Sequence, residues 1–226
     1  MEKIIIANQK MYLNSLDEIK KFQNDLINYK DKFIVAPSYI YLENFVNKGF
    51  QVASQNISDK SVGAHTGEVS AKALKDLKVK YTLVGHAELR KKFKEKNLIP
   101  KKIENALENG LTVILCIGET KDEKKDGKTF EVIKKKLKNI KPNNNLIISY
   151  EPIWSIGNNK IPNDEDLEKI VNYIKSLGHN KVLYGGSVST ENIQHLNKIK
   201  NIDGFLIGSS AIKASNLIKI IEVVSK

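Results

Sequence analysis

The sequence predicts an α/β protein built as a closed (β/α)8 barrel, with eight parallel strands surrounded by helices. Apolar runs rich in β-branched residues recur along the chain, and an amphipathic helical pattern follows each of them. The runs are almost continuously apolar, which is typical of strands buried on both faces of a parallel sheet. Eight such units favour a barrel. A doubly wound open sheet is the alternative, because a strand count cannot show closure.

The expected strands are separated by segments long enough for crossover helices. The first run, "IIIANQK", precedes a helical pattern at 15–29, and the second, "FIVAPS", precedes one at 39–47. Parallel neighbours need such crossovers, because the chain must return to the same end of the sheet. In order, the eight runs are 4–10, 33–38, 51–56, 81–86, 112–119, 146–152, 181–186 and 204–209.

The composition is that of a globular protein. With 226 residues, 41% of them hydrophobic, the chain can bury a sizeable core. No linker, low-complexity tract or shift in composition divides the sequence. We therefore expect a single barrel domain over residues 1–226.

The sequence favours a cytoplasmic protein without a membrane partner. Its first residues, "MEKIIIANQK", offer too short an apolar stretch for a secretory signal, and no segment is long enough to span a bilayer. The single cysteine, Cys116, lies in "VILCIG" without an evident partner base, so a buried apolar role is favoured over a nucleophilic one. No metal is expected, because the four histidines lack metal-ligand spacing: His65, His86, His179 and His195.

The net charge of +11 raises the possibility of a nucleic-acid partner. The lysines, however, fall on the polar side of helical patterns, as on a solvated surface helix. We therefore expect no nucleic-acid partner, although the charge could steer an anionic small molecule. The apolar residues of these patterns are Val132, Ile133 and Leu137 in 131–141, and Leu89 and Phe93 in 89–97.

Polar residues and glycines gather where the predicted strands end. Glu151, for example, directly follows the strand-like run "LIISY". In a barrel the carboxyl ends of all strands share one rim, where active sites are built, so residues far apart in sequence would meet there. The residues at these ends are Asn8, Lys10, Gln55, Asn56, His86, Glu119, Glu151, Ser187, Gly208 and Ser209.

Seven motifs resemble those of the triosephosphate isomerase family, in the same order and across nearly the whole chain. They are "NQK", "GAHTGE", "GHAELR", "CIGE", "YEPIWSIG", "YGGSV" and "DGFLIGSS". One such motif alone is a weak signal, but seven in the correct order are a specific one. The resemblance implies the TIM-barrel fold, and because the family's chains are commonly longer, shortened loops and helices are expected here.

The resemblance implies the interconversion of dihydroxyacetone phosphate and D-glyceraldehyde 3-phosphate, an aldose-ketose isomerisation of glycolysis and gluconeogenesis, without cofactor or metal. Such a reaction needs a base that removes a proton from carbon beside a carbonyl and returns it to the neighbouring carbon, through an enediolate. By resemblance this base is Glu151. The family is itself the usual illustration of a carboxylate base working with a neutral histidine, so the assignment is inherited from it.

Further roles follow from the resemblance. His86 would be the electrophile, and its place at the start of a predicted helix would disfavour the imidazolium form. Lys10 would supply a permanent positive charge, Asn8 a polar donor, and Glu88 would orient Lys10 and the substrate. Each residue alone could have an ordinary structural role. Their joint placement at strand ends favours the catalytic one.

The segment "PIWSIGNNK" at 152–160 resembles the lid of the family. Ile156 and Leu206 would press against Glu151 and exclude water, and the hydroxyl of Tyr184 would help to hold the closed lid. Helices predicted after "YGGS" and "LIGSS" would favour an anion at their amino ends. Backbone N–H groups for the substrate phosphate would come from Gly157, Ser187, Gly208 and Ser209.

A homodimer is implied by the segment 61–70, which resembles a loop that reaches into the neighbouring subunit, where Thr66 would support Lys10 and Asn8. Leu89 makes this contact less secure, since it stands where the family has an arginine that pairs with the acid at Glu68.

Three other positions depart from the family's motifs. Gln9 replaces a tryptophan, which removes apolar packing but no reacting group. Ser209 replaces a glycine and brings a side chain close to the phosphate. Ala87 replaces a serine that holds the glutamate in its resting position, so the resting pose of Glu151 is open.

Two other functions compete with the isomerase. A different phosphosugar enzyme on the same barrel, such as an epimerase or a lyase, would need a metal or a Schiff-base lysine, and neither is indicated. A nucleic-acid binder would show a salt-sensitive affinity, but the sequence lacks interleaved aromatic and basic residues.

Overall fold

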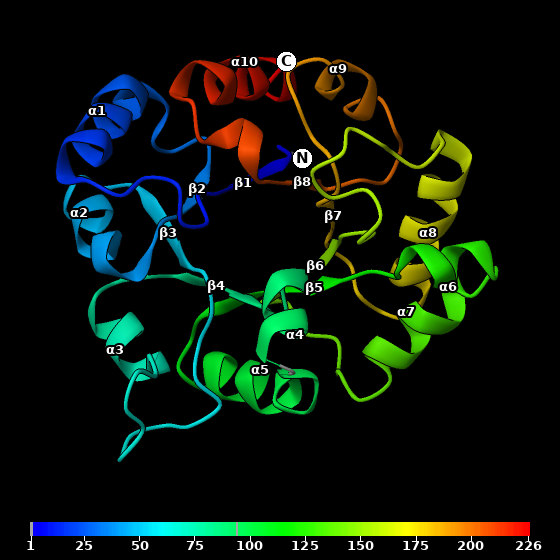
Figure 1. Cartoon of the computed structure of the whole chain (residues 1–226), viewed down its shortest axis with the longest axis horizontal. Helices are drawn as coiled ribbons and strands as arrows, with labels where there is room; N and C mark the ends of the chain where they lie inside the picture. Colours follow the sequence, from blue (N-terminus) through cyan, green and yellow to red (C-terminus); the bar gives the residue numbers. More distant parts are fainter. Residues whose placement is uncertain (1, 94) are drawn as a thin grey trace.

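The computed structural model describes residues 2–93 and 95–226, and its strands form one closed, all-parallel barrel. Each strand pairs with the next in sequence, and β8 closes the ring against β1 (Figure 1). The predicted (β/α)8 barrel is therefore confirmed, and closure excludes the open sheet. The strands are β1 (Ile4–Asn8), β2 (Ile34–Ala36), β3 (Gln51–Ser54), β4 (Tyr81–Val84), β5 (Thr112–Ile117), β6 (Leu146–Tyr150), β7 (Val182–Tyr184) and β8 (Gly204–Ile207).

Helices surround this barrel. The pattern at 15–29 forms a helix that begins after Ser15, whose side chain accepts a hydrogen bond from the N–H of Glu18 in a capping box. The described α-helices are α1 (Leu16–Leu26), α2 (Leu42–Asn47), α3 (Ala71–Asp76), α4 (Ala87–Phe93), α5 (Ile99–Glu108), α6 (Lys121–Lys125), α7 (Thr129–Leu137), α8 (Asp164–Ser176), α9 (Ile193–Leu196) and α10 (Ala214–Val224). Short 3-10 turns are η1 (Ile27–Tyr29), η2 (Tyr39–Tyr41), η3 (Glu95–Asn97) and η4 (Ser209–Ala211).

The core has two layers, because successive strand residues point to opposite faces. On β5, Ile114 and Cys116 join the cluster inside the barrel, whereas Val113, Leu115 and Ile117 join the larger cluster between strands and helices. Both faces of every strand are therefore buried in apolar surroundings. This is the physical reason for the continuous apolar runs in the sequence.

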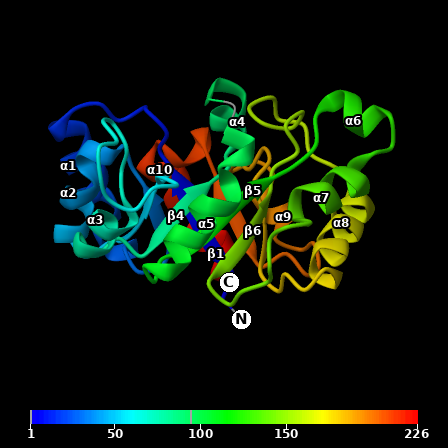
Figure 2. The same cartoon turned by 90° about the horizontal axis from the view of Figure 1, so that it is seen from below.

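The carboxyl ends of the strands share one end of the barrel. Seen from the side, both termini lie at the opposite end, while α4 and the loop after β6 rise together at the rim (Figure 2). The rim is therefore formed by the segments that directly follow the strands, as the barrel prediction required.

The two basic helical segments behave differently. In α7, Val132, Ile133 and Leu137 are buried, as expected of an amphipathic surface helix. Helix α4 buries none of its residues, and Phe93 is 56% exposed. The apolar side of α4 therefore does not face the core, and Lys94 of the same basic segment lies outside the described residues. None of the described helices has the length and apolar character needed to cross a membrane.

Candidate active site

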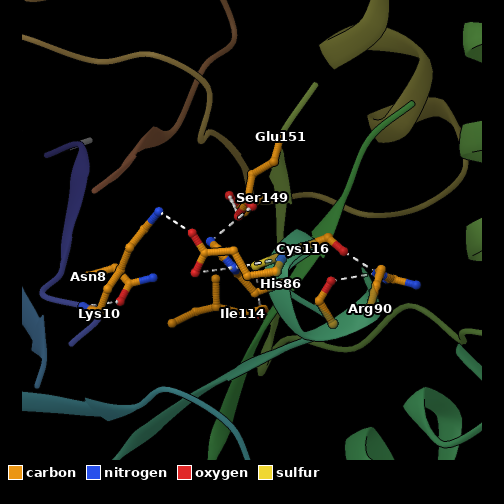
Figure 3. Close-up of polar contacts among 10 residues, drawn as sticks. Asn8, Lys10, His86, Arg90, Ile114, Cys116, Ser149 and Glu151 are labelled. Atoms are coloured by element: carbon orange, nitrogen blue, oxygen red, sulfur yellow. Dashed lines mark hydrogen bonds and ion pairs between the residues drawn. The ribbon is translucent and has the colours of Figure 1, made fainter. Parts of the chain in front are cut away.

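The sequence-predicted residues converge at the rim around a cavity of about 150 Å³. The cavity receives side chains from the ends of β1, β4, β6 and β8, and the segment at 152–160 forms its roof. Figure 3 shows Asn8, Lys10, His86 and Glu151 gathered in this region. The predicted residues that line the cavity are Asn8, Lys10, His86, Glu151, Ile156, Gly157, Ser187, Leu206, Gly208 and Ser209.

Glu151 follows β6 and points into this cavity, which answers the open question of its pose. Its side chain is 2% exposed, and its Oε2 atom lies 3.6 Å from Nε2 of His86. Its Oε1 atom accepts a hydrogen bond of 3.2 Å from the hydroxyl of Ser149 (Figure 3). Among the described residues, Oε2 has no hydrogen-bond partner. One carboxylate oxygen is therefore held by the protein, and the other is left for a proton or a substrate.

Ser149 was not singled out by the sequence analysis. It is buried on β6, two residues before Glu151. Residues two apart lie on the same face of a strand, so this spacing was the available signal.

His86 lies between β4 and α4, where the backbone places its ring in the site. Its Nδ1 atom accepts a hydrogen bond of 3.4 Å from the backbone N–H of Glu88, in the first turn of the helix. A neutral imidazole has one donor and one acceptor nitrogen, so this contact leaves the ring proton on Nε2. The donor nitrogen is then the one that faces Glu151 and the cavity.

Lys10 has a left-handed backbone, with φ of 50°, which is costly for a residue other than glycine. Three hydrogen bonds hold this conformation. The N–H of Lys10 donates to Oδ1 of Asn8 at 3.0 Å, and its carbonyl accepts from Ser38 Oγ at 3.1 Å and from Gln55 Nε2 at 2.7 Å. Asn8 and Gln55 thus position the lysine through its backbone, and its ammonium group reaches across the cavity.

Glu88 connects Lys10 with His86. Its Oε1 atom accepts a 2.6 Å hydrogen bond from Nζ of Lys10, and its Oε2 atom lies 3.8 Å from Nδ1 of His86. Burial raises the pKa of Glu88, but the hydrogen bond and charge of Lys10 lower it below its ordinary value overall. Glu88 is therefore a carboxylate at neutral pH, and its contact with Lys10 is the one that the sequence analysis expected.

Cys116 lies beside Glu151 at the floor of the site. Its thiol is 1% exposed, and burial together with the negative charge of Glu151 raises its pKa well above the ordinary value. Arg90 supports the same region, because its guanidinium donates to the carbonyl oxygens of Gly85 at 2.5 Å and Cys116 at 2.8 Å. The burial expected for Cys116 is confirmed, and a neutral thiol fits no nucleophilic role.

Residues 152–160, which we call the lid, lie over the cavity. Nε1 of Trp154 donates to Oε1 of Glu119 at 2.8 Å, and Nζ of Lys124 lies 3.9 Å from the centre of the indole ring. At the far side of the lid, the N–H of Asn159 donates to the hydroxyl of Ser187 at 3.2 Å. The lid is therefore closed. Glu119, which was predicted at a strand end without a role, holds Trp154 of the lid by this hydrogen bond.

The four residues expected to hold phosphate lie together, but the helices near them differ from expectation. Helix α9 begins at Ile193, well after Ser187, and has only 4 residues. The 3-10 turn η4 begins directly at Ser209. An added Cβ at Gly208 would come within 3.4 Å of Cε of Lys10, so this strand end passes close to the lysine. The backbone N–H of Ser187 donates to Oγ of Ser155 at 3.2 Å, so in this structure it is not offered to an anion as expected. An anion here would meet the Lys10 charge and the backbone at Gly208 and Ser209, without the helix end expected after "YGGS".

A second cavity, of about 520 Å³, adjoins the site and is also lined by Lys10, His86 and Glu88. Its lining also includes the apolar side chains of Met11, Leu89 and Phe93. The apolar side chains of α4, Leu89 and Phe93, therefore border this cavity and not the core.

Thr66 lies in an exposed loop and lines neither of these two cavities. The base of its loop is fixed, since Nδ2 of Asn105 donates to the carbonyls of Ser58 at 3.0 Å and Lys60 at 2.9 Å. Thr66 is thus a predicted site residue that lines neither cavity.

Tyr184 lies beneath the lid, and its hydroxyl is 3.0 Å from Oγ of Ser155.

Comparison with known proteins agrees with this geometry. The family model described as Triosephosphate isomerase matches residues 3–224. A triosephosphate isomerase of Wolbachia pipientis wMel is 37% identical over 233 residues, covering 100% of this chain and 96% of the relative. One of Mycoplasmopsis agalactiae is 39% identical, covering 97% and 95%, and one of Dictyostelium discoideum is 36% identical, covering 92% and 89%.

Proposed function

The chain belongs to the triosephosphate isomerase family and is an isomerase, and we propose that it interconverts dihydroxyacetone phosphate and D-glyceraldehyde 3-phosphate through an enediolate. The observation that carries this proposal is the meeting of three groups at one small cavity. Oε2 of Glu151 lies 3.6 Å from Nε2 of His86, and Lys10 lines the same space. These are a base, a neutral hydrogen-bond donor and a positive charge.

Glu151 is the proposed base. Its oxygen Oε2 has no partner among the described residues and borders the cavity. A substrate carbon placed there would lose a proton to the carboxylate, and the same group would return the proton to the neighbouring carbon. Ile156 and Leu206 border the same cavity, which supports their proposed role in keeping water from the carboxylate.

His86 is the proposed electrophile. With Nδ1 accepting from the backbone of Glu88, the ring offers Nε2–H to the substrate oxygens. During the reaction negative charge moves from one oxygen of the enediolate to the other, and a donor already in position stabilises it without reorganisation.

Lys10 and Asn8 are the proposed electrostatic partners. The ammonium of Lys10 supplies a positive charge that faces the intermediate and its phosphate, and Asn8 both lines the cavity and fixes the backbone of Lys10. We propose that Glu88 orients Lys10, because it accepts the hydrogen bond of the ammonium group when no substrate is present.

The phosphate is proposed to lie between the lid and the last two strands. Gly157, Ser187, Gly208 and Ser209 border the same cavity as Glu151. Gly157 has φ of 73°, which suits glycine and leaves its N–H free of side-chain obstruction. A closed lid would also protect the enediolate, which can lose its phosphate when exposed to water.

We propose that the protein is a homodimer through residues 61–70. Single exposed apolar side chains are common, but Met11 and Phe93, which are 79% and 56% exposed, line the same cavity. Val62, within the segment itself, is 70% exposed. The cavity of about 520 Å³ would receive the partner's loop, where its Thr66 would support Lys10 and Asn8. The glycolytic context and the cytoplasmic location stay predictions from the sequence.

A coupled assay of triose phosphate interconversion, without added metal or cofactor, tests the proposal. The unmodified chain should be active, and Glu151→Gln should lose a factor of about 10² to 10⁴ in turnover, because the base is removed while the shape is kept. Glu43→Gln, the same change at an exposed position on α2, serves as the control and should stay active. An inactive unmodified chain would refute the function. Equal turnover of the Glu151→Gln and unmodified proteins would refute the base.

A further inference from the structure

Ser155 is a lid residue that the proposed mechanism does not use. Its side chain is fully buried, at 0% exposure, and its hydroxyl has three hydrogen-bond partners. Oγ donates to the carbonyl of Lys160. It lies 3.0 Å from the hydroxyl of Tyr184 and accepts a 3.2 Å hydrogen bond from the backbone N–H of Ser187.

These contacts use the full capacity of the hydroxyl group. A serine hydroxyl has one hydrogen to donate and two lone pairs to accept with. The carbonyl of Lys160 can only accept and the N–H of Ser187 can only donate, so the hydroxyl of Tyr184 must donate to Ser155. No capacity of the Ser155 hydroxyl is left for the substrate, which argues for a structural task within the lid.

The partners come from two parts of the molecule. Lys160 belongs to the far arm of the lid, whereas Tyr184 and Ser187 belong to the end of β7 and the turn after it. Ser155 therefore joins both arms of the lid to the rigid barrel at one point. Gly186 leaves the space for this, since an added Cβ there would collide with the hydroxyl of Tyr184 and approach Oγ of Ser155 to 2.7 Å.

We propose that Ser155 is a positioning residue whose hydroxyl holds the lid closed over Glu151. In the closed lid its removal would leave Tyr184, Ser187 and Lys160 each with one lost hydrogen bond. In an open lid, water would replace those bonds, so the loss falls on the closed state. A lost hydrogen bond between neutral groups corresponds to a shift of about tenfold in such an equilibrium.

The only tryptophan of the chain, Trp154, provides a direct test, because it lies in the lid next to Ser155. In the Ser155→Ala variant, acrylamide should quench the Trp154 fluorescence at least about twofold more strongly than in the unmodified protein, since an opened lid exposes the indole. Ser176→Ala, which removes an exposed hydroxyl at the end of α8, is the matched control and should not change quenching. Identical quenching of the Ser155→Ala and unmodified proteins would overturn the proposal.

A second measurement rests on the proposed isomerase function. In Ser155→Ala, a lid that opens about tenfold more often would release more inorganic phosphate per isomerisation, because more enediolate would escape before it is protonated. The electron pair of the free enediolate expels phosphate as the C–O bond breaks, and the enol that remains tautomerises to a 2-oxoaldehyde. Tyr184→Phe should raise the phosphate ratio too, and the double variant should add little, since both changes remove the same contact. An unchanged phosphate ratio in an active Ser155→Ala enzyme would overturn the proposal. An unmodified chain without isomerase activity would instead refute the function, and the fluorescence comparison would still decide the role of Ser155.

Discussion

Nζ of Lys10, just after β1, donates a 2.6 Å hydrogen bond to Oε1 of Glu88, in the first turn of α4. The same glutamate donates its backbone N–H to Nδ1 of His86. One residue thus restrains the positive charge through its side chain and the imidazole through its backbone. A substitution at Glu88 can separate these two effects, because it changes the side-chain contact with Lys10 and leaves the backbone contact with His86.

Glu88→Gln should therefore lower kcat/KM by about tenfold to a hundredfold, because Lys10 loses its charged partner and its ammonium group is no longer held in place. The expected readout is the coupled assay, with circular dichroism as the check on folding. Glu68→Gln removes an exposed acid that lines the adjoining cavity and should have a smaller effect. Full activity of Glu88→Gln would show that Lys10 needs no such partner.

Gln9 is a candidate for stabilisation. It is 1% exposed, and within the described part of the chain neither of its amide atoms has a hydrogen-bond partner. Gln9→Met keeps the side-chain length and removes this cost, so the free energy of unfolding should rise by about 1–2 kcal/mol. Urea denaturation measures it. Gln23→Met, where Nε2 alone lacks a partner among the described residues, should gain less. A destabilised Gln9→Met protein would contradict the expectation.

Lys136 should make stability depend on alkaline pH. Burial, and then the charge of Arg90, lower its pKa from 10.5 to about 8. Between those two values the unfolded chain binds the proton more tightly than the folded protein, so the free energy of unfolding rises with pH through that window. This contribution should amount to about 2–3 kcal/mol and be missing in Lys136→Met.

Urea denaturation at a series of pH values from about 7 to about 11 measures this effect, because the series spans the folded and the unfolded pKa of Lys136. Other lysines and tyrosines titrate in both proteins, so the difference between them isolates Lys136. Lys135→Met removes an exposed neighbour on α7 and should follow the unmodified protein. Parallel curves for Lys136→Met and the unmodified protein would mean that the pKa of Lys136 is not lowered.

Cys116 should resist alkylation in the folded protein. It is 1% exposed, and its raised pKa keeps the thiol protonated at neutral pH. The thiolate is the reactive form, so iodoacetamide should modify Cys116 only as fast as the protein unfolds. Mass spectrometry over time, with and without urea, checks this. Rapid labelling in buffer would show an open path to the floor of the active site.

Phe93→Glu should weaken the proposed dimer, because a charge would enter the lining of the cavity that we propose to receive the partner's loop. Light scattering should show a mass moving from two chains towards one, with a parallel fall in activity. Phe130→Glu introduces the same charge at a phenylalanine that is 42% exposed on α7, outside this surface, and should leave the mass unchanged. A single-chain mass for the unmodified protein would refute the dimer.

Much of the barrel was readable from local sequence, because strands buried on both faces must be apolar throughout. The run "TVILCI" supplies Ile114 and Cys116 to the interior and Val113, Leu115 and Ile117 to the outer layer, and all of them are buried. The same logic placed Glu151 and His86 at strand ends. Where the helices deviate, as at the four-residue α9 after "YGGS", the reason is that short segments are shaped by packing more than by their own propensity.

Local sequence patterns were enough to predict that eight strands alternate with helices and that the candidate catalytic residues stand at strand ends, because burial and periodicity are local properties of a chain. These residues are Asn8, Lys10, His86 and Glu151. The three-dimensional structure was needed to show that the strands close, that Glu151 turns inward beside Ser149, and that Ser155 joins the lid to Tyr184. The pairing of β1 with β8 and the contact of Ser155 with Tyr184 join residues far apart in the sequence, and sequence separation does not give distance in space. They exist only because the closed ring brings its strand ends around one cavity.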